Sequence, residues 1–173
     1  MNGMQTTNEP SDLQARFAAG RASGLLFETE IWMASKVSAI SPMVELLMQL
    51  IEGYRCVVGN EPDVQLALRE ALNNAVIHGN ARNAHKLVQV RCRCELETGV
   101  QITVTDYGEG FDPSEVPDPL TAERLLAENG RGIHLMKSMM DEVSFNRGGS
   151  KVHMRKASAR KPETEPQRDP QGK

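Results

Sequence analysis

The stretch DVQLALREALNNAVIHGN at Asp63–Asn80 decides the fold. Asn60 or Glu61 can cap a helix at this point, and Pro62 suits its first turn. Gly79 follows the last apolar residue and marks the expected end of the helix. Apolar residues recur at helical spacing and form one broad face: Val64, Ala67, Leu68, Ala71, Leu72, Ala75 and Val76. The stretch therefore predicts a helix that packs this face on a core.

A polar strip runs along the same helix. Glu70, Asn74 and His78 stand four residues apart, so their side chains should follow one line on the helix surface. Apolar residues flank this line on both sides, which predicts that the strip faces protein rather than water. A carboxylate and an amide in such a surface need partners, because an unpaired buried polar group costs stability. A divalent cation with its anionic ligand is one such partner.

Length and charge limit the class of protein. The chain has 173 residues, which is enough for one domain with a real core and hardly for two. Its formal net charge of -3 gives no electrostatic reason to expect nucleic acid as a direct partner. No run of about 18 apolar residues is present, and the N-terminus lacks the apolar core of a secretory signal. We therefore expect a cytoplasmic protein that does not enter the membrane.

The cysteines are Cys56, Cys92 and Cys94. An odd count, with two of them in a C-x-C inside a strand pattern, predicts free thiols in a reducing cytosol. The paired ligands that a closed zinc site requires are missing, so a structural zinc site is not expected.

The remaining pattern predicts one domain over residues 21–156, between a flexible arm at 1–20 and a disordered tail at 157–173. Its expected elements besides the central helix are a strand over 24–34, a helix from Ser41 to about 54, a strand over 86–97, a strand from 100, a helix from 130 to about 140, and short strands over 142–147 and 151–155. The strand over 86–97 directs alternate residues to the core: Val88, Val90, Cys92, Cys94 and Leu96.

An acidic residue occupies the next inward-facing position of the following strand. Asp106 ends the alternation of Val100, Ile102 and Val104, and Gly108 and Gly110 follow it. One interpretation is an aspartate that caps a turn. The other is a buried acceptor for a donor group of a ligand, such as the exocyclic amine of adenine, with glycines that let the ligand approach the backbone.

The segment that follows is typical of a lid and a phosphate-binding loop. Residues 112–129 are acidic and proline-rich, which indicates either a lid or a connection without a role. Gly130, Arg131 and Gly132 then begin a helix, where exposed N–H groups and the helix dipole favour an anion. Arg131 either adds a charge-assisted contact to a phosphate or is simply solvated.

The order of these elements is more specific than any one of them. Neither a G-x-x-x-x-G-K-[ST] loop nor a dinucleotide-type G-x-G-x-x-G is present. Four motifs, however, occur together: EALNNAVIHGN at 70–80, DYGEGFDP at 106–113, GRGIHLMKSMMDEV at 130–143 and GGSKVHMRK at 148–156. Over residues 25–156 the chain resembles the histidine-kinase-like (GHKL) ATP-binding domains. Within them it most resembles the small bacterial anti-sigma factors that are also serine-protein kinases.

This resemblance implies an α+β fold, a two-layer α/β sandwich in which helices cover one face of a mixed sheet. It implies ATP and Mg²⁺ as ligands, with Glu70 orienting or deprotonating the attacking hydroxyl and Asn74 holding the metal. His78 is then expected to have a structural role at the end of the helix. The implied nucleotide contacts are Asp106 at the adenine amine, Gly108 and Gly110 at the adenine end, Gly130, Arg131 and Gly132 at the phosphates, and Ser150 near the base.

The implied function is partner switching. Such a protein binds a sigma factor and phosphorylates a serine of a STAS-type anti-sigma factor antagonist, and a homodimer is compatible with the family. Two alternatives remain open from the sequence: a nucleotide-gated binding module without kinase activity, and a stand-alone catalytic domain of a histidine kinase. The second lacks a phospho-acceptor helix, because His134 and His153 lie inside the nucleotide-binding region itself.

Overall fold

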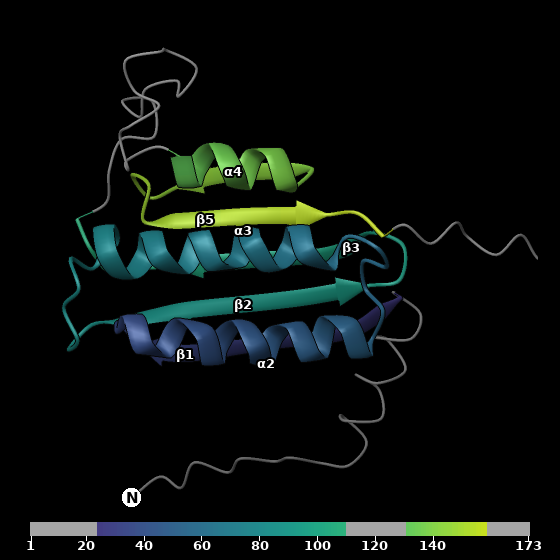
Figure 1. Ribbon diagram of the computed structural model, residues 1–173, viewed down its shortest axis with the longest axis horizontal. Helices are drawn as coiled ribbons and strands as arrows, with labels where there is room; N and C mark the ends of the chain where they lie inside the picture. The colour runs from purple at the N-terminus through teal and green to yellow at the C-terminus, as the bar shows by residue number, and fades with distance from the viewer. Residues whose placement is uncertain (1–23, 110–130, 159–173) are drawn as a thin grey trace, which may run out of the picture.

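Five strands form one sheet in the order β1-β2-β3-β5-β4 (Figure 1). Their bounds are β1 Leu25–Ala34, β2 Leu87–Glu95, β3 Gly99–Thr105, β4 Glu142–Asn146 and β5 Lys151–Lys156. The computed structural model describes residues 24–109 and 131–158. All four pairings in this part of the chain are antiparallel. The predicted mixed sheet is therefore wrong in this respect: β4 runs parallel to β3, but β5 lies between them and opposes both.

The helices cover one face of this sheet and leave the other open, as Figure 1 shows. Their bounds are η1 Val37–Ala39, α2 Ile40–Gly53, α3 Glu61–Asn73, the π-helix η2 Asn74–Gly79, and α4 Arg131–Met139. The predicted α+β sandwich with helices on one face is confirmed. No helix in the described ranges is both long and apolar enough to cross a membrane.

The central helix forms where the sequence predicts it. Asn60 stands at its N-cap position and Pro62 lies in its first turn, although the Asn60 side chain makes no capping hydrogen bond. Every residue of the predicted apolar face is buried. After Asn73 the helix widens into η2, where the N–H of Asn80 donates to the carbonyl of Ala75 at 2.8 Å, five residues earlier. The predicted helix is therefore α-helical in its first part and a π-helix at its end.

The core lies between α2, α3 and α4 and the inner face of the sheet. Val88, Val90, Cys92 and Cys94 of β2 are buried, which confirms the predicted alternation. Leu96 lies beyond the end of β2 and is exposed, so the prediction that it shares the buried face is wrong. The alternation ends where the strand ends.

Two of the three cysteines are joined in a disulfide between Cys56 and Cys94. The prediction of free thiols is thus wrong for this pair and holds for Cys92, which is buried. The fold brings the turn after α2 to the end of β2, so that the Cα atoms of Cys56 and Cys94 are 6.0 Å apart although 38 residues separate them in sequence. Spacing along the chain does not reveal such a contact. Burial raises the pKa of the Cys92 thiol to about 12.

Several predicted segments lie outside the described residues. These are the arm at 1–20, the lid at 112–129 and the tail from residue 159 onward. Ala157 and Ser158, the first residues of the predicted tail, are described, and the N–H of Ala157 donates to the Asp141 carboxylate at 2.7 Å. The domain limits at 21 and 156 stay predictions.

Candidate functional site

A buried carboxylate stands at the end of β3. The backbone N–H of Asp106 donates to the carbonyl of Ser150 at 2.9 Å, which fixes it beside the turn before β5. Its Oδ1 accepts the N–H of Gly108 at 2.9 Å. Burial raises the pKa of the Asp106 carboxyl, while the Gly108 N–H and the positive charge of Lys86 act in the opposite direction. The bond to Gly108 uses Oδ1 and not Oδ2, so this carboxylate caps the turn with one of its two oxygens.

Two glycines make room for this carboxylate. A Cβ on Gly79, at the end of η2, would overlap the Asp106 carboxyl and lie 2.6 Å from its Oδ1. A Cβ on Gly108 would overlap the carbonyl oxygen of Gly79. The end of η2 and the loop after β3 therefore approach each other as bare backbone. This contact gives Gly79 a second role besides the predicted helix stop.

Asn80 is a site residue to which sequence reasoning assigned no role. Its side chain is fully buried, donates through Nδ2 to the carbonyl of Leu87 at 3.0 Å, and accepts the N–H of Tyr107 at its Oδ1, also at 3.0 Å. It therefore connects the end of η2, the beginning of β2 and the loop that contains Asp106. The only signal in the sequence is a polar residue directly after a helix-ending glycine.

The other half of the site lies where α3 becomes η2 and α4 begins. A Cβ on Gly132, in the first turn of α4, would lie 2.9 Å from Glu70 Oε2 and 3.5 Å from Asn74 Oδ1. Glu70 and Asn74 thus reach the same point beside the glycine of the predicted phosphate loop. Asn74 Nδ2 is buried and has no hydrogen-bond partner in the described part of the chain. An orphaned amide of this kind indicates a missing ligand or water.

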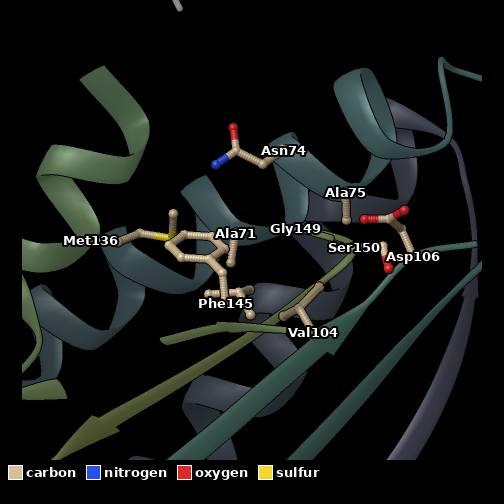
Figure 2. Close-up of a pocket in the computed structure, with 10 residues that line it drawn as sticks. Ala71, Asn74, Ala75, Val104, Asp106, Met136, Phe145, Gly149 and Ser150 are labelled. Carbon is tan, nitrogen blue, oxygen red and sulfur yellow. The ribbon is translucent and has the colours of Figure 1, made fainter. Parts of the chain in front are cut away.

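One cavity connects the two halves (Figure 2). Asn74 lies at one end and Asp106 at the other, with an apolar floor between them. The lining residues are Ala71, Asn74, Ala75, Val104, Asp106, Met136, Phe145, Gly149, Ser150 and Val152. Ser150 is among the lining residues, and its hydroxyl donates to the carbonyl of Arg147 at 2.9 Å. Apolar side chains that lie between a buried carboxylate and a buried amide are typical of the lining of a small-molecule site.

Not every predicted residue joins this cavity. His78 is exposed, so the prediction that the whole polar strip faces protein is wrong at this position. The wider turn of η2 explains the error, because a spacing of four residues no longer superimposes side chains in a π-helix. Gly110 and Gly130 lie outside the described residues, and Arg131 is described only as the first backbone position of α4.

The donor set fits a weakly ligated metal better than a closed metal site. In the described ranges, no group of three or more His, Cys, Asp or Glu side chains is placed to hold an ion. Mg²⁺ keeps several of its waters and takes few protein oxygens when it accompanies a triphosphate. Asn74 Oδ1 and the adjacent Glu70 carboxylate are compatible with that mode of binding.

The chain is similar to known proteins over the region that contains this site. Residues 33–156 match the family described as "Histidine kinase-like ATPase domain". The chain is also 34% identical over 99 residues to "Anti-sigma F factor" proteins of Bacillus cereus (strain G9842), Bacillus thuringiensis (strain Al Hakam) and Bacillus mycoides (strain KBAB4). The similarity covers 54% of this chain and 67% of each of those proteins. The family match spans the whole described sandwich except most of β1, and the chain therefore belongs to the histidine kinase-like ATPase domain family.

Proposed function

We propose that the protein binds ATP with Mg²⁺ in this cavity and transfers the γ-phosphoryl group to a serine of a partner protein. The observation that carries the proposal is the cavity with Asn74 and Asp106 at its two ends, with Glu70 and Gly132 beside Asn74. Within its family the chain is similar to anti-sigma F factors, and this supports the narrower proposal that it binds a sigma factor and phosphorylates an anti-sigma factor antagonist. We propose that it does so in the cytoplasm.

Adenine recognition is assigned to the β3 end of the cavity. Asp106 Oδ1 is already occupied by the Gly108 N–H, which orients the carboxylate and leaves Oδ2 to accept a hydrogen bond from an exocyclic amine. The apolar residues Ala75, Val104 and Val152 line the space where the ring would lie. Guanine carries a carbonyl instead of the amine at that position, so an acceptor on the protein selects adenine.

Phosphoryl transfer is assigned to the opposite end. It requires charge neutralisation and in-line positioning more than covalent chemistry from the protein. Asn74 would hold Mg²⁺, which neutralises negative charge on the phosphate oxygens when it is bound. Gly132 places no side chain beside Glu70 and Asn74 in the first turn of α4, and the backbone N–H groups of a helix start favour an anion.

Glu70 is the proposed general base. The serine hydroxyl loses its proton to Glu70 as its oxygen bonds to the γ-phosphorus, and the bond from that phosphorus to the leaving oxygen of ADP breaks. The carboxylate stands one helical turn before Asn74 on a rigid helix, so its distance from the metal ligand is fixed by the backbone. A base on a loop would not hold this spacing.

The test is transfer of labelled phosphate from ATP to a purified antagonist protein, together with calorimetry of nucleotide binding. We expect acid-stable phosphoserine for the wild type. Glu70→Gln should bind ATP and lose about 10²-fold or more of the transfer rate, whereas Asn74→Ala should lose Mg²⁺-dependent binding. Glu45→Gln, which changes an exposed glutamate on α2, is the matched control and should behave like the wild type.

The other outcomes either favour a different function or contradict the proposal. Nucleotide binding without transfer favours a nucleotide-gated binding module, and acid-labile phosphohistidine favours a histidine kinase catalytic domain. Equal affinity for ATP and GTP would contradict the role of Asp106. A purified protein with no affinity for adenine nucleotides in the presence of Mg²⁺ refutes the whole proposal.

A further inference from the structure

The sheet face that carries no helices has an ordered surface of its own. Side chains at matching positions line up across the strands, and one row runs through Trp32, Gln89, Thr105 and Lys151 on β1, β2, β3 and β5. This row lies at the end of the sheet where β3 leads into Asp106. Figure 1 shows that α2, α3 and α4 all lie on the other side.

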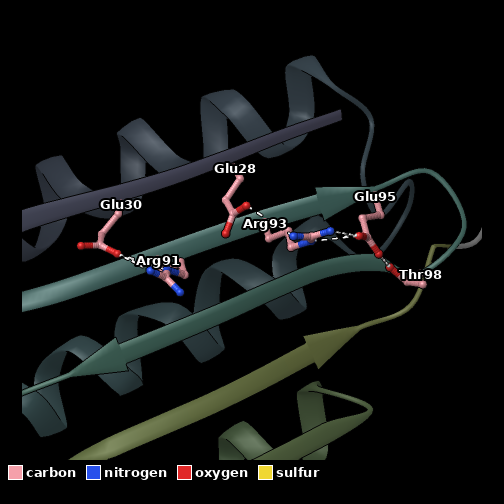
Figure 3. A network of polar contacts seen from close by, with 6 residues as sticks. All are labelled: Glu28, Glu30, Arg91, Arg93, Glu95 and Thr98. Atoms are coloured by element: carbon pink, nitrogen blue, oxygen red, sulfur yellow. Dashed lines mark hydrogen bonds and ion pairs between the residues drawn. The ribbon is translucent and has the colours of Figure 1, made fainter. Parts of the chain in front are cut away.

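Most charges on this open face are paired. Arg91 and Glu30 form an ion pair at 2.7 Å, and Arg93 contacts both Glu28 and Glu95 (Figure 3). Arg155 of β5 and Glu142 of β4 form a further pair. Carboxylates of the same face already balance the charges of these arginines, so we do not expect this part of the face to attract a charged partner.

The end of the face beside the cavity is different. Three large side chains are about half exposed here: Trp32 at 48%, Leu87 at 46% and Tyr107 at 46%. We call these three residues the aromatic patch, after the rings of Trp32 and Tyr107. The rings of Trp32 and Tyr107 are stacked, with centroids 5.8 Å apart. Large rings that are ordered against each other and still half exposed to water are typical of protein interfaces. They lose little conformational entropy when a partner covers them.

Three lysines lie at the same end of the sheet as the aromatic patch, and the charge of one of them, Lys86, also acts on the Asp106 carboxyl. Lys36 follows the end of β1, Lys86 precedes β2, and Lys151 begins β5, all at this end of the sheet. The N–H of Ser35 donates to the carbonyl of Lys86 at 3.1 Å, which holds the first two segments together. Within residues 24–109 and 131–158 none of the three lysines forms an ion pair, in contrast to the arginines of the same face.

We infer that the aromatic patch and its lysines are a docking surface for an acidic segment of a partner protein, one that places an apolar side chain between carboxylates. The apolar side chain covers Trp32, Leu87 and Tyr107, and the carboxylates meet the three lysines. The chemistry favours protein over nucleic acid. Trp32 and Tyr107 already stack on each other, which occupies ring faces that bases would use, and the chain carries a net charge of -3. The inference goes beyond phosphoryl transfer and does not depend on it.

The chain supplies its own probe, because Trp32 is its single tryptophan. Trp32 fluorescence of the full-length protein is measured without nucleotide during titration with a set of synthetic peptides that carry Leu and Phe between glutamates. The expected result is a saturable change with these peptides. It should weaken when the ionic strength is raised, since screening reduces the attraction between exposed charges. Peptides with lysines in place of the glutamates should give no change.

Charge reversals locate the response. The double variant Lys86→Glu with Lys151→Glu should lower the peptide affinity by about tenfold or more, because it turns attraction into repulsion on both sides of the patch. Lys137→Glu is the matched control on the exposed side of α4 and should leave the affinity unchanged. All three positions are at least partly solvated, so we expect these variants to fold, and thermal unfolding verifies this.

Four results would overturn the inference. The first is no saturable change with any acidic peptide up to about 1 mM. The second is equal weakening by Lys137→Glu, and the third is tighter binding of single-stranded oligothymidine than of the peptides. The fourth is a change in the sedimentation of the free protein on Trp32→Ala, which would assign the patch to contact with a second copy of the chain.

Discussion

The substitution Gly79→Ala tests the close approach on which the adenine end of the cavity depends. The added methyl group would overlap the Asp106 carboxyl, because the Cβ position lies 2.6 Å from Oδ1 and nearer still to the other carboxyl atoms. The carboxylate cannot retreat freely, since its Oδ1 is held by the Gly108 N–H and its backbone by the carbonyl of Ser150. Either the loop after β3 moves away from η2 or Asp106 changes rotamer.

Both routes cost stability. Overpacking of a close contact costs about 1–3 kcal/mol, and loss of a hydrogen bond to a charged group costs about 1.5–3 kcal/mol. A cost of up to about 3 kcal/mol by either route should lower the melting temperature by as much as roughly 6–12 °C for a chain of this size. The same movement displaces the acceptor for the adenine amine, so ATP affinity should fall as well. Thermal unfolding and calorimetry with ATP measure the two effects.

Gly53→Ala is the matched control. Gly53 is the last residue of α2, and a Cβ at this position would meet no atom within 4 Å. Alanine is the better helix former, so this variant should gain up to about 1 kcal/mol and keep its ATP affinity. If Gly79→Ala unfolds at the wild-type temperature and binds ATP normally, the contact between η2 and the Asp106 loop is not what shapes the site, and the reasoning fails.

Three further predictions concern other parts of the domain. Gly132→Ala should be as stable as the wild type, because the added methyl group crowds only Oε2 at the flexible end of Glu70. It should nevertheless slow phosphoryl transfer, and an unchanged rate would contradict the proximity of Gly132 and Glu70. Lys156→Met should lower the free energy of unfolding in urea by about 2–3 kcal/mol, because Nζ contacts Asp63 and the Met139 carbonyl from a mostly buried position. An unaltered midpoint would show that these contacts have no net effect on stability. Asp106→Asn should raise the melting temperature at pH 7, and this gain should shrink as the pH falls through the carboxyl range. The sign follows from the raised pKa: the folded state favours the protonated Asp106 carboxyl, so the contribution of this one group to wild-type stability is greatest at low pH and is lost as Asp106 ionises. A gain that is independent of pH would exclude this explanation.

Sequence patterns predict the helices and strands well because each element obeys its local period. The apolar face of α3 and η2 from Val64 to Val76 and the alternation of β2 lie where the sequence predicts them, since these residues have one obvious side to bury. The pairing of β5 between β3 and β4 could not be predicted in this way. Strand order depends on which edges meet after the chain has crossed α4, and the sequence of each strand is compatible with several neighbours.

The candidate site is predicted in part for the same physical reason. Asp106 is recognisable because an acid interrupts an apolar alternation, and Asn74 because it interrupts an apolar helix. Asn80 and Gly79 are not recognisable, because their roles depend on backbone groups of Leu87 and of the loop after β3. Contacts between segments that are distant in sequence leave no period to detect. The disulfide between Cys56 and Cys94 belongs to the same class.

The departures from local rules are concentrated at the cavity. The helix widens into a π-helix at Asn74, and Asn74 Nδ2 is buried without a partner among the residues that the structure describes. A carboxylate is buried at Asp106, and two glycine backbones touch there. Each departure costs stability on its own, and elsewhere buried side chains are almost all apolar. Stability alone would place apolar residues at Asn74 and Asp106. A bound ligand that gives the amide and the carboxylate their partners removes part of the cost. This explains why all these departures lie around one space. It also explains why removal of the Asp106 charge should stabilise the protein and at the same time weaken adenine binding.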